Sequence, residues 1–208
     1  MTVTTESLSK RFNREWIFRD FNHTFQPGIH AVTGPNGSGK STLLQVLWGQ
    51  LPATSGMVRY KQGEVVIPIE DIYKHLSFAA PYIDLMDELT LPEMLKFHFS
   101  FKKLRDGIDP GNLMDMLELS HAKNKQVGHF SSGMKQRLKL GLALFSDVKM
   151  IFMDEPTTNL DKESVTWYWK HFGQISPETI VFIGSNHESE YPATAAKINL
   201  SDYKQGYK

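Results

Sequence analysis

A glycine-rich segment that lies between an apolar run and a helix-like pattern constrains the fold of this chain most strongly. The apolar run covers residues 29–33, and the apolar residues within 43–48 recur at helical spacing. The segment between them consists of Gly34, Pro35, Asn36, Gly37, Ser38, Gly39, Lys40, Ser41 and Thr42. A strand followed by such a loop and a helix predicts an α/β fold in which the loop wraps phosphate groups.

The residue types in this loop match the chemistry of phosphate binding. Glycines let the backbone approach a ligand closely, so that successive N–H groups and the positive end of the following helix face phosphate oxygens. Lys40 supplies a mobile positive charge, and the Ser41 hydroxyl is an oxygen ligand of the kind that Mg²⁺ prefers. The alternative is a glycine-rich turn with an incidental lysine, which does not explain why the whole pattern is present.

Two carboxylates follow a second apolar run. Residues 150–153 are all apolar, which is typical of a buried parallel strand, and Asp154 and Glu155 come directly after them. Neighbouring strand residues point to opposite faces of a sheet. We therefore expect Asp154 to bind a metal ion or its waters and Glu155 to activate an attacking water. An acidic pair after a strand is also common in solvated loops and helix caps, so this interpretation depends on the phosphate loop.

Composition limits the classes of partner. The 208 residues contain 23 Lys and Arg and 23 Asp and Glu, so the net charge is zero, and no nucleic-acid partner is expected. The absence of cysteine excludes thiolate zinc sites and cysteine nucleophiles. No apolar run approaches the roughly 18 residues of a membrane span. The first residues lack the pattern of a secretory signal, so we expect a cytoplasmic protein.

Sequence patterns divide the single expected domain, residues 1–208, into three regions. Residues 1–81 combine β-branched and aromatic residues with frequent turn signals, which predicts short strands and contains the phosphate loop. Residues 82–147 read as a helical lobe. Residues 148–208 alternate strand and helix patterns, which predicts parallel crossover units and the remainder of the core.

Individual elements can be predicted within these regions. Strand-like runs occur at 57–60 and 64–69. Thr90 and Glu93 form a capping-box pattern ahead of a helix in the lobe, and a further helix is expected at 162–173.

A second helix start is predicted at residues 130–137, which read Phe-Ser-Ser-Gly-Met-Lys-Gln-Arg and precede a leucine-rich helical run. Such an end can receive a phosphate group through Ser131 and the backbone N–H groups near Gly133. Serine is also among the commonest N-cap residues, so a helix that is merely capped by serine is the alternative.

Together these features resemble the ABC-type ATPase family, and the resemblance covers about residues 2–200. Residues 34–42 are similar to its Walker A loop, 130–137 to its signature motif, and 150–155 to its Walker B strand with the catalytic glutamate. Three further positions match the D-loop, the switch histidine and the aromatic residue that stacks on adenine: Asp161, His187 and Phe12.

The resemblance implies a P-loop NTPase core with a mixed or parallel sheet, an N-terminal antiparallel β-subdomain and a helical signature subdomain. It also implies a role for each matching residue. The catalytic residues are Lys40, Glu155 and His187; ATP is bound by Phe12 and residues 34–42; Mg²⁺ is bound by Ser41 and Asp154; and the ATP of a partner protomer is contacted by Ser131, Ser132, Gly133 and Asp161.

The function implied is ATP hydrolysis that powers an ABC transporter, with an exporter favoured, through ATP-driven closure of a dimer. The partners would be a second copy or a second ABC ATPase, together with separate transmembrane permease subunits. The protein would then lie on the cytoplasmic face of the cell membrane. A soluble ABC-type ATPase that drives cofactor or complex assembly has the same motifs and remains the alternative.

Two motifs depart from the family pattern. Ser132, Gly133 and Met134 stand where the signature normally carries two consecutive glycines and then glutamine. Pro81 stands where alignment places the Q-loop glutamine, and proline has neither a side-chain amide nor an N–H group. Tyr82 or Asp84 could replace that glutamine, or both could simply pack or cap the lobe.

Three of the matching residues also have ordinary structural interpretations. Phe12 could be a core aromatic, and His187 a surface histidine. Asp161 could be the N-cap of the helix at 162–173, which is compatible with a functional role.

Overall fold

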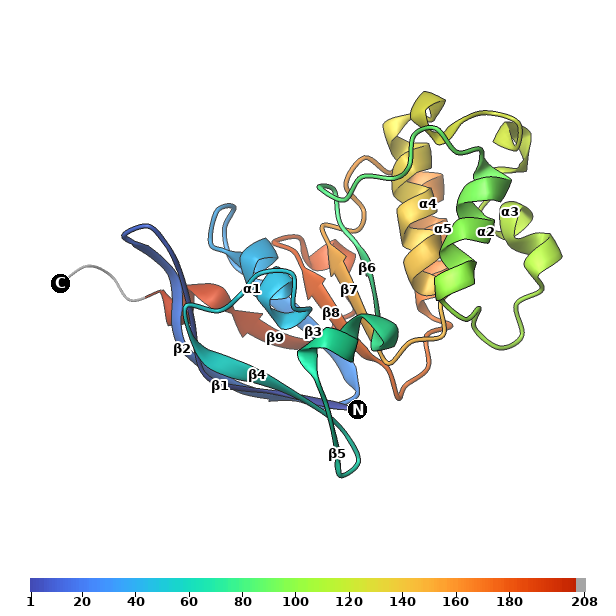
Figure 1. The fold of residues 1–208 in the computed structure, drawn as a ribbon. Helices are drawn as coiled ribbons and strands as arrows, with labels where there is room; N and C mark the ends of the chain where they lie inside the picture. Colours follow the sequence, from blue (N-terminus) through green and yellow to red (C-terminus); the bar gives the residue numbers. More distant parts are fainter. Residues whose placement is uncertain (205–208) are drawn as a thin grey trace.

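The computed structural model describes residues 1–204, which form two β-sheets with helices on their faces (Figure 1). One sheet is antiparallel and has the strand order β2-β1-β4-β5. Its strands are β1 (Thr2–Phe12), β2 (Glu15–Phe25), β4 (Ser55–Gln62) and β5 (Val65–Ile67).

The second sheet is parallel throughout and has the order β6-β7-β8-β3-β9. Its strands are β3 (Gly28–Thr33), β6 (Leu76–Ala79), β7 (Met150–Asp154), β8 (Ile180–Gly184) and β9 (Ala196–Asn199). The sequence expectation of an α/β fold with an antiparallel N-terminal sheet is confirmed. Because all these strands run the same way, the loops that follow them meet at one edge of the sheet.

Five α-helices accompany the sheets within the described residues: α1 (Lys40–Leu47), α2 (Leu91–Phe101), α3 (Leu113–Met116), α4 (Ser132–Leu144) and α5 (Lys162–Phe172). The expected capping box starts α2, where the Thr90 backbone N–H donates to Glu93 Oε2 at 2.8 Å. None of these helices is long and apolar enough to cross a membrane.

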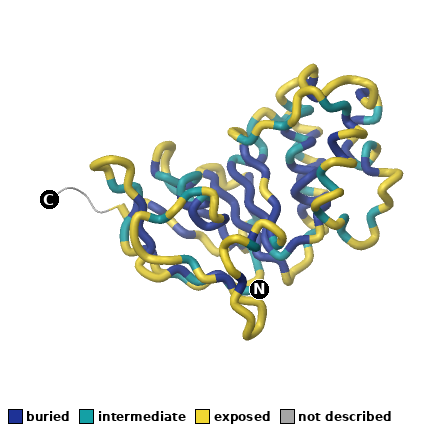
Figure 2. The backbone as a smooth tube through the Cα atoms, viewed as in Figure 1, coloured by how far each residue is buried: buried dark blue, intermediate teal, exposed yellow. Residues whose placement is uncertain are grey.

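The core has two halves on opposite faces of the parallel sheet. Ile151 and Met153 of β7 pack with the apolar residues of α4 and α5, while Met150 and Phe152 pack with α1 and the antiparallel sheet. This alternation is the expected result of a strand with both faces covered. Figure 2 accordingly shows the central strands among the buried stretches and the connecting loops as exposed.

One strand prediction was wrong at its end. The run at 64–69 forms a strand only over Val65–Ile67, and a 3-10 helix follows at Ile69–His75. Pro68 lies between them and has no N–H to donate to a sheet, which ends the strand there. The predicted helix at 162–173 is α5, with Gly173 as its C-cap.

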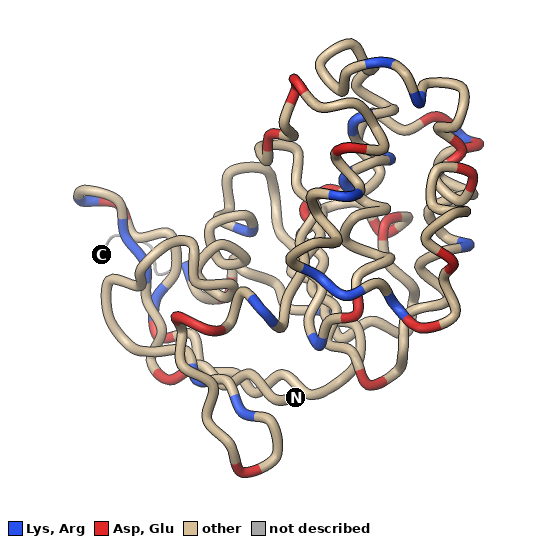
Figure 3. Tube along the Cα trace, turned by 45° about the vertical axis from the view of Figure 1, so that its right-hand side comes forward, with Lys and Arg blue, Asp and Glu red and all other residues tan. Residues whose placement is uncertain are grey.

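Charged residues of both signs are interleaved along the chain, as Figure 3 shows. In this view positive and negative residues are mixed locally and do not form separate acidic and basic halves, in keeping with the net charge of zero.

Candidate active site

The phosphate loop connects the carboxyl end of β3 to the first turn of α1. Gly39 is the N-cap of that helix and has a φ of 103°, in the region that only glycine adopts freely. A Cβ atom at Gly39 would lie 2.1 Å from Ile17 Cγ2 of the antiparallel sheet. The close approach of this loop to β2 therefore requires glycine here, and the helix N-terminus remains open to an anion.

Lys40 is held inside this loop. Its side chain is 5% exposed, and Nζ donates hydrogen bonds to the carbonyl oxygens of Gly34 at 2.9 Å and Pro35 at 3.2 Å. The hydroxyl of Ser38 is buried in the same loop and has no hydrogen-bond partner among residues 1–204. A buried polar atom without a partner is costly, so both side chains suit a loop that completes its hydrogen bonds with phosphate oxygens.

Asp154 ends β7 beside the start of α1 and is 2% exposed. Burial raises the pKa of its carboxyl group, and the nearby Glu155 charge acts in the same direction, while Ser41 and Lys40 oppose the shift. Its Oδ1 atom is buried and has no hydrogen-bond partner in the described part of the chain. An unpaired carboxylate oxygen next to a serine hydroxyl fits a hard cation such as Mg²⁺.

Protein ligands alone do not complete a metal site here. Within residues 1–204 no group of three His, Cys, Asp or Glu side chains is close enough to hold a metal ion. Mg²⁺ commonly takes one or two protein ligands and completes its shell with water and substrate phosphates. Ser41 and Asp154 therefore fit a site that is completed by a nucleotide.

Glu155 follows Asp154 but leaves the line of the strand. Its φ of 44° lies in the left-handed region, which is strained for a residue other than glycine. The backbone N–H donates to the Gly184 carbonyl oxygen at 2.8 Å, and Thr158 Oγ1 donates to Oε2 at 3.4 Å. Asp154 contacts Ser41 and Tyr82, whereas Glu155 contacts Thr158, so the two carboxylates have different neighbours. Alternation along a strand does not explain this difference, because Glu155 lies beyond the end of β7.

His187 lies in the loop after β8 and is exposed. Its backbone N–H donates to Ser185 Oγ at 2.9 Å. The neighbouring Asn186 donates from Nδ2 to Oδ1 of Asn36 at 3.2 Å, which joins this loop to the phosphate loop. Sequence reasoning missed Asn186, and its position next to His187 is the only signal that could have pointed to it.

The amino end of α4 carries the signature residues at the outer end of the helical lobe (Figure 1). Ser131 is the N-cap and accepts a hydrogen bond from the Met134 N–H at 3.2 Å. Asp161 caps α5 by accepting from the Ser164 N–H at 2.8 Å. The capping interpretations of both residues are therefore confirmed.

Both caps face a hollow of about 320 Å³. It is lined by Glu118, Leu119, His121, Ser131, Gly133, Met134, Arg137, Asn159, Asp161 and Ser164. The structure thus brings together three of the four residues expected to contact a partner's ATP, and Ser132 is the one that does not line the hollow. No residue of the phosphate loop lines it either.

Phe12 is the last residue of β1 and is 45% exposed, so it does not belong to the core. The ammonium group of Lys10 lies 4.9 Å from the ring centroid. An exposed aromatic face of this kind is available for stacking, and the alternative of a packed core aromatic does not hold.

At the position of the missing glutamine, Tyr82 and not Pro81 reaches the site. Pro81 is exposed, and its carbonyl oxygen accepts a 3.0 Å hydrogen bond from Lys139 Nζ. The Tyr82 hydroxyl contacts the side chains of Gln45 and Asp154, and burial raises the pKa of this phenol. Asp84 is exposed near Lys139.

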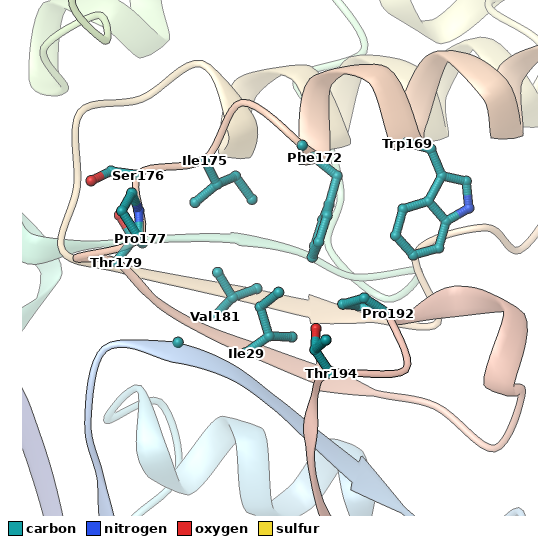
Figure 4. Close-up of a pocket in the computed structure, with 12 residues that line it drawn as sticks. Ile29, Trp169, Phe172, Ile175, Ser176, Pro177, Thr179, Val181, Pro192 and Thr194 are labelled. Atoms are coloured by element: carbon teal, nitrogen blue, oxygen red, sulfur yellow. The ribbon is translucent and has the colours of Figure 1, made fainter.

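A larger cavity of about 560 Å³ lies elsewhere (Figure 4). Ile29 and Val181 form one side of it, and Trp169 and Phe172 of α5 point toward it from the other. Gly28 and Thr179 place it at the amino ends of β3 and β8, which is the sheet edge opposite the phosphate loop. It contains none of the predicted site residues.

Comparison with known structures finds the same fold. A putative ATP-binding protein of an ABC transporter from Pyrococcus furiosus superposes with a TM-score of 0.80, at 23% identity over 99% of this chain and 100% of its own. The dimeric ATP-binding cassette MJ0796, in a post-hydrolysis state with ADP and Pi, superposes with a TM-score of 0.69. It is 20% identical and matches over 88% of this chain and 87% of its own.

Sequence comparison shows the family. Residues 18–158 match the family model described as ABC transporter. The cytochrome c biogenesis ATP-binding export protein CcmA of Brucella abortus is 31% identical over 79% of this chain and 75% of its own length. The chain therefore belongs to the ABC transporter family, as an ATP-binding subunit that hydrolyses ATP.

Proposed function

We propose that this ATPase powers an exporter from the cytoplasmic face of the cell membrane, as a subunit separate from its permease. In this proposal two such chains, or this chain and a second ABC ATPase, close around ATP. The observation that supports this closure around ATP is the division of the site into two surfaces. The phosphate loop and carboxylates form one surface, and the hollow at the start of α4 forms another.

The separation of these surfaces favours a dimer. Ser131 and Gly133 line a hollow at a helix N-terminus, which attracts phosphate, yet no residue of 34–42 lines it. A second copy that is related by a twofold axis would supply its own phosphate loop to this hollow, and the reverse contact would follow by symmetry. ATP would then be part of both interfaces and would control their closure.

Within one protomer the nucleotide would lie between Phe12 and the phosphate loop. The exposed ring of Phe12 would stack on adenine. Lys40 would exchange its bonds to Gly34 and Pro35 for phosphate oxygens, which offer a charged partner in place of neutral carbonyls. The remaining residues of 34–42 would contribute backbone N–H groups and the Ser38 hydroxyl.

Ser41 and Asp154 are the residues that would hold Mg²⁺, directly or through water. When bound, the ion supplies positive charge next to the phosphate oxygens. Tyr82 contacts Asp154 through its hydroxyl and is proposed to orient that carboxylate in place of the absent glutamine.

Glu155 is proposed as the general base. It would accept a proton from a water whose oxygen attacks the γ-phosphorus in line, as the bond between that phosphorus and the bridging β-γ oxygen breaks and ADP leaves. His187 would hydrogen-bond the transferred phosphoryl group, and its loop is tied to the phosphate loop through Asn186 and Asn36. Lys40 would stabilise the charge that develops on the oxygens.

The direction of transport is supported by one relative, whose name describes an export protein. An ATPase that acts in cofactor or complex assembly would have the same catalytic residues and remains the second candidate. The two differ in their partners, so purification from native membranes decides between them. We expect an integral membrane permease to co-purify in a fixed ratio, whereas a purely soluble complex would contradict the transport proposal.

The dimer is tested directly with the Glu155→Gln variant, which should bind ATP without consuming it. Light scattering after size-exclusion chromatography should give a monomer with ADP and a dimer with ATP and Mg²⁺. Gly133→Asp in the same background is the matched variant, because a carboxylate in the hollow would repel phosphate. It should bind ATP normally and stay monomeric, and a monomer in every condition for Glu155→Gln would contradict the proposal.

A further inference from the structure

A buried carboxylate that has no role in the proposed mechanism lies beside the candidate active site. Glu190 is 3% exposed and ends the 3-10 turn Glu188–Glu190 after β8. Glu188, at the start of the same turn, is exposed and forms a 2.5 Å ion pair with Lys197. The two glutamates therefore lie in opposite environments although only one residue separates them.

Glu190 is surrounded by hydrogen-bond donors. Its Oε1 atom accepts from the Thr157 backbone N–H at 3.0 Å and from Thr157 Oγ1 at 2.5 Å. Its Oε2 atom accepts from the hydroxyl of Ser185. Among residues 1–204, no Lys, Arg or His side chain forms an ion pair with it. The hydrogen bonds to its two oxygens therefore come from uncharged donors, namely one backbone N–H and two hydroxyl groups.

These donors belong to two different loops. Thr157 lies two residues after Glu155, and Ser185 lies two residues before His187. Ser185 Oγ also accepts the His187 backbone N–H at 2.9 Å, and the Glu190 N–H donates to the His187 carbonyl oxygen at 3.1 Å. One carboxylate therefore joins the loop that carries the proposed base to the loop that carries the proposed phosphate ligand.

The turn is itself anchored from outside the site. The hydroxyl of Tyr168, which is fully buried on α5, donates to the Glu190 carbonyl oxygen at 3.1 Å. Burying a carboxylate without a cation is expensive, and the cost is offset only while several donors remain in place. Movement of either loop would leave an oxygen of Glu190 without its partner, so the arrangement opposes independent motion of the two loops.

We propose that Glu190 is a positioning residue that fixes the Glu155 loop relative to the His187 loop. It is buried and acts through Thr157 and Ser185. This inference rests on the catalytic roles proposed above for Glu155 and His187. Its consequence is that Glu190 affects the rate of the chemical step and leaves ATP binding unchanged, because displacement of catalytic groups lowers turnover more than affinity.

The first test compares Glu190→Gln with Glu188→Gln in the full chain. The amide keeps the size of the side chain but offers one acceptor oxygen to two loops. Steady-state phosphate release should show a kcat about 10- to 100-fold lower for Glu190→Gln, with KM within about twofold. Glu188→Gln should keep both constants. A kcat of Glu190→Gln within about twofold of the unmodified chain would overturn the proposal.

A second test does not depend on the folding of the Glu190 variant. Thr157→Val and Ser185→Ala each remove one hydroxyl donor, and Glu190 joins the two positions. If it couples them, the double variant should lose little more kcat than the more affected single variant. Independent, multiplicative losses would overturn the coupling.

A control separates failure of this inference from failure of the proposed mechanism. If Glu155→Gln hydrolyses ATP at the unmodified rate, the role of Glu155 is wrong. A different result points to Glu190 alone: Glu155→Gln is inactive, Glu190→Gln is fully active, and the losses of kcat caused by Thr157→Val and Ser185→Ala simply multiply in the double variant. In that case only the role of Glu190 is wrong.

Discussion

The backbone N–H of Glu155 donates a 2.8 Å hydrogen bond to the carbonyl oxygen of Gly184, which joins the end of β7 to the end of β8. Gly184 is also packed against the Asp154 side chain. A Cβ atom at this glycine would lie 2.7 Å from Asp154 Oδ1 and 2.9 Å from Leu44 Cδ1. The proposed metal ligand and the first helix therefore leave no room for a larger residue.

Gly184→Ala should consequently displace Asp154 or α1. We expect the free energy of unfolding to fall by about 1–3 kcal/mol, as for other insertions into a packed core, and the affinity for ADP with Mg²⁺ to fall as well. Denaturant titration and calorimetric binding measure the two effects. Gly173→Ala is the control, because its nearest contact would be 3.4 Å, and it should change neither quantity appreciably.

Asp154→Asn should stabilise the nucleotide-free protein. Burial raises the pKa of Asp154 above its ordinary 3.8, so the folded state binds this proton more tightly than the unfolded state does. The stability contribution is present at low pH and is lost as the pH rises through the raised pKa, above which the ionised carboxyl group is a buried charge. Removing that charge should increase Tm by about 2–4 °C for each kcal/mol recovered.

The same Asp154→Asn variant should lose the additional stabilisation that Mg²⁺ gives in the presence of ADP. Thermal scans with EDTA and with Mg²⁺ separate the two effects. A lower Tm in EDTA, or an unchanged Mg²⁺ response, would contradict the assignment of Asp154.

Tyr82→Phe tests the residue that reaches the site beside Pro81. The ring remains, but the hydroxyl that contacts Asp154 and Gln45 is removed. We expect the Mg²⁺ concentration for half-maximal stabilisation of the ADP complex to rise about three- to tenfold, which corresponds to the loss of one hydrogen bond. ADP affinity in EDTA should not change. Tyr73→Phe is the control, since Tyr73 is 59% exposed and outside the site, and an identical shift in both variants would refute the role of Tyr82.

His98 should make the protein sensitive to acid. Burial and the nearby Lys102 lower the pKa of His98 from 6.5 to about 4, and its Nε2 lies 3.0 Å from Ser146 Oγ. A lowered histidine pKa contributes stability above pH 6.5 that is lost as the pH falls toward 4. The full effect is about 3 kcal/mol.

His98→Leu should flatten the decrease in stability between pH 6.5 and pH 4. Ser146 still donates to the Leu142 carbonyl oxygen at 2.7 Å, so the substitution leaves its hydroxyl hydrogen satisfied. Denaturant midpoints across this range measure the effect, and an equal slope in both proteins would exclude His98 as its source.

Local residue patterns predicted much of this fold. The phosphate loop, β7 and both helix caps depend on nearby residues, and the structure has them where the sequence indicates. The parallel sheet follows from alternating strand and helix patterns. Because β7 and β8 pair in parallel, their carboxyl ends come together and Asp154 lies opposite Gly184.

Long-range contacts could not be predicted in the same way. In the sequence Glu190 looks like an ordinary surface glutamate, two residues after Glu188, and only the fold brings Thr157 to it across 33 positions. Tyr82 reaches Asp154 from the turn that follows β6. The sequence therefore could not choose between Tyr82, Asp84 and a purely structural role for both. Pro68 is a local signal that ends β5, and a strand that runs on to residue 69 takes no account of it.

Glu155 is proposed as the base for ATP hydrolysis at the loop that contains Lys40. The most direct measurement is single-turnover hydrolysis of ATP by Glu155→Gln, with ATP affinity measured on the same sample. We predict unchanged affinity and a hydrolysis rate about 10²–10⁴-fold below that of the unmodified chain. Hydrolysis at the unmodified rate by a variant that binds ATP normally would contradict the account.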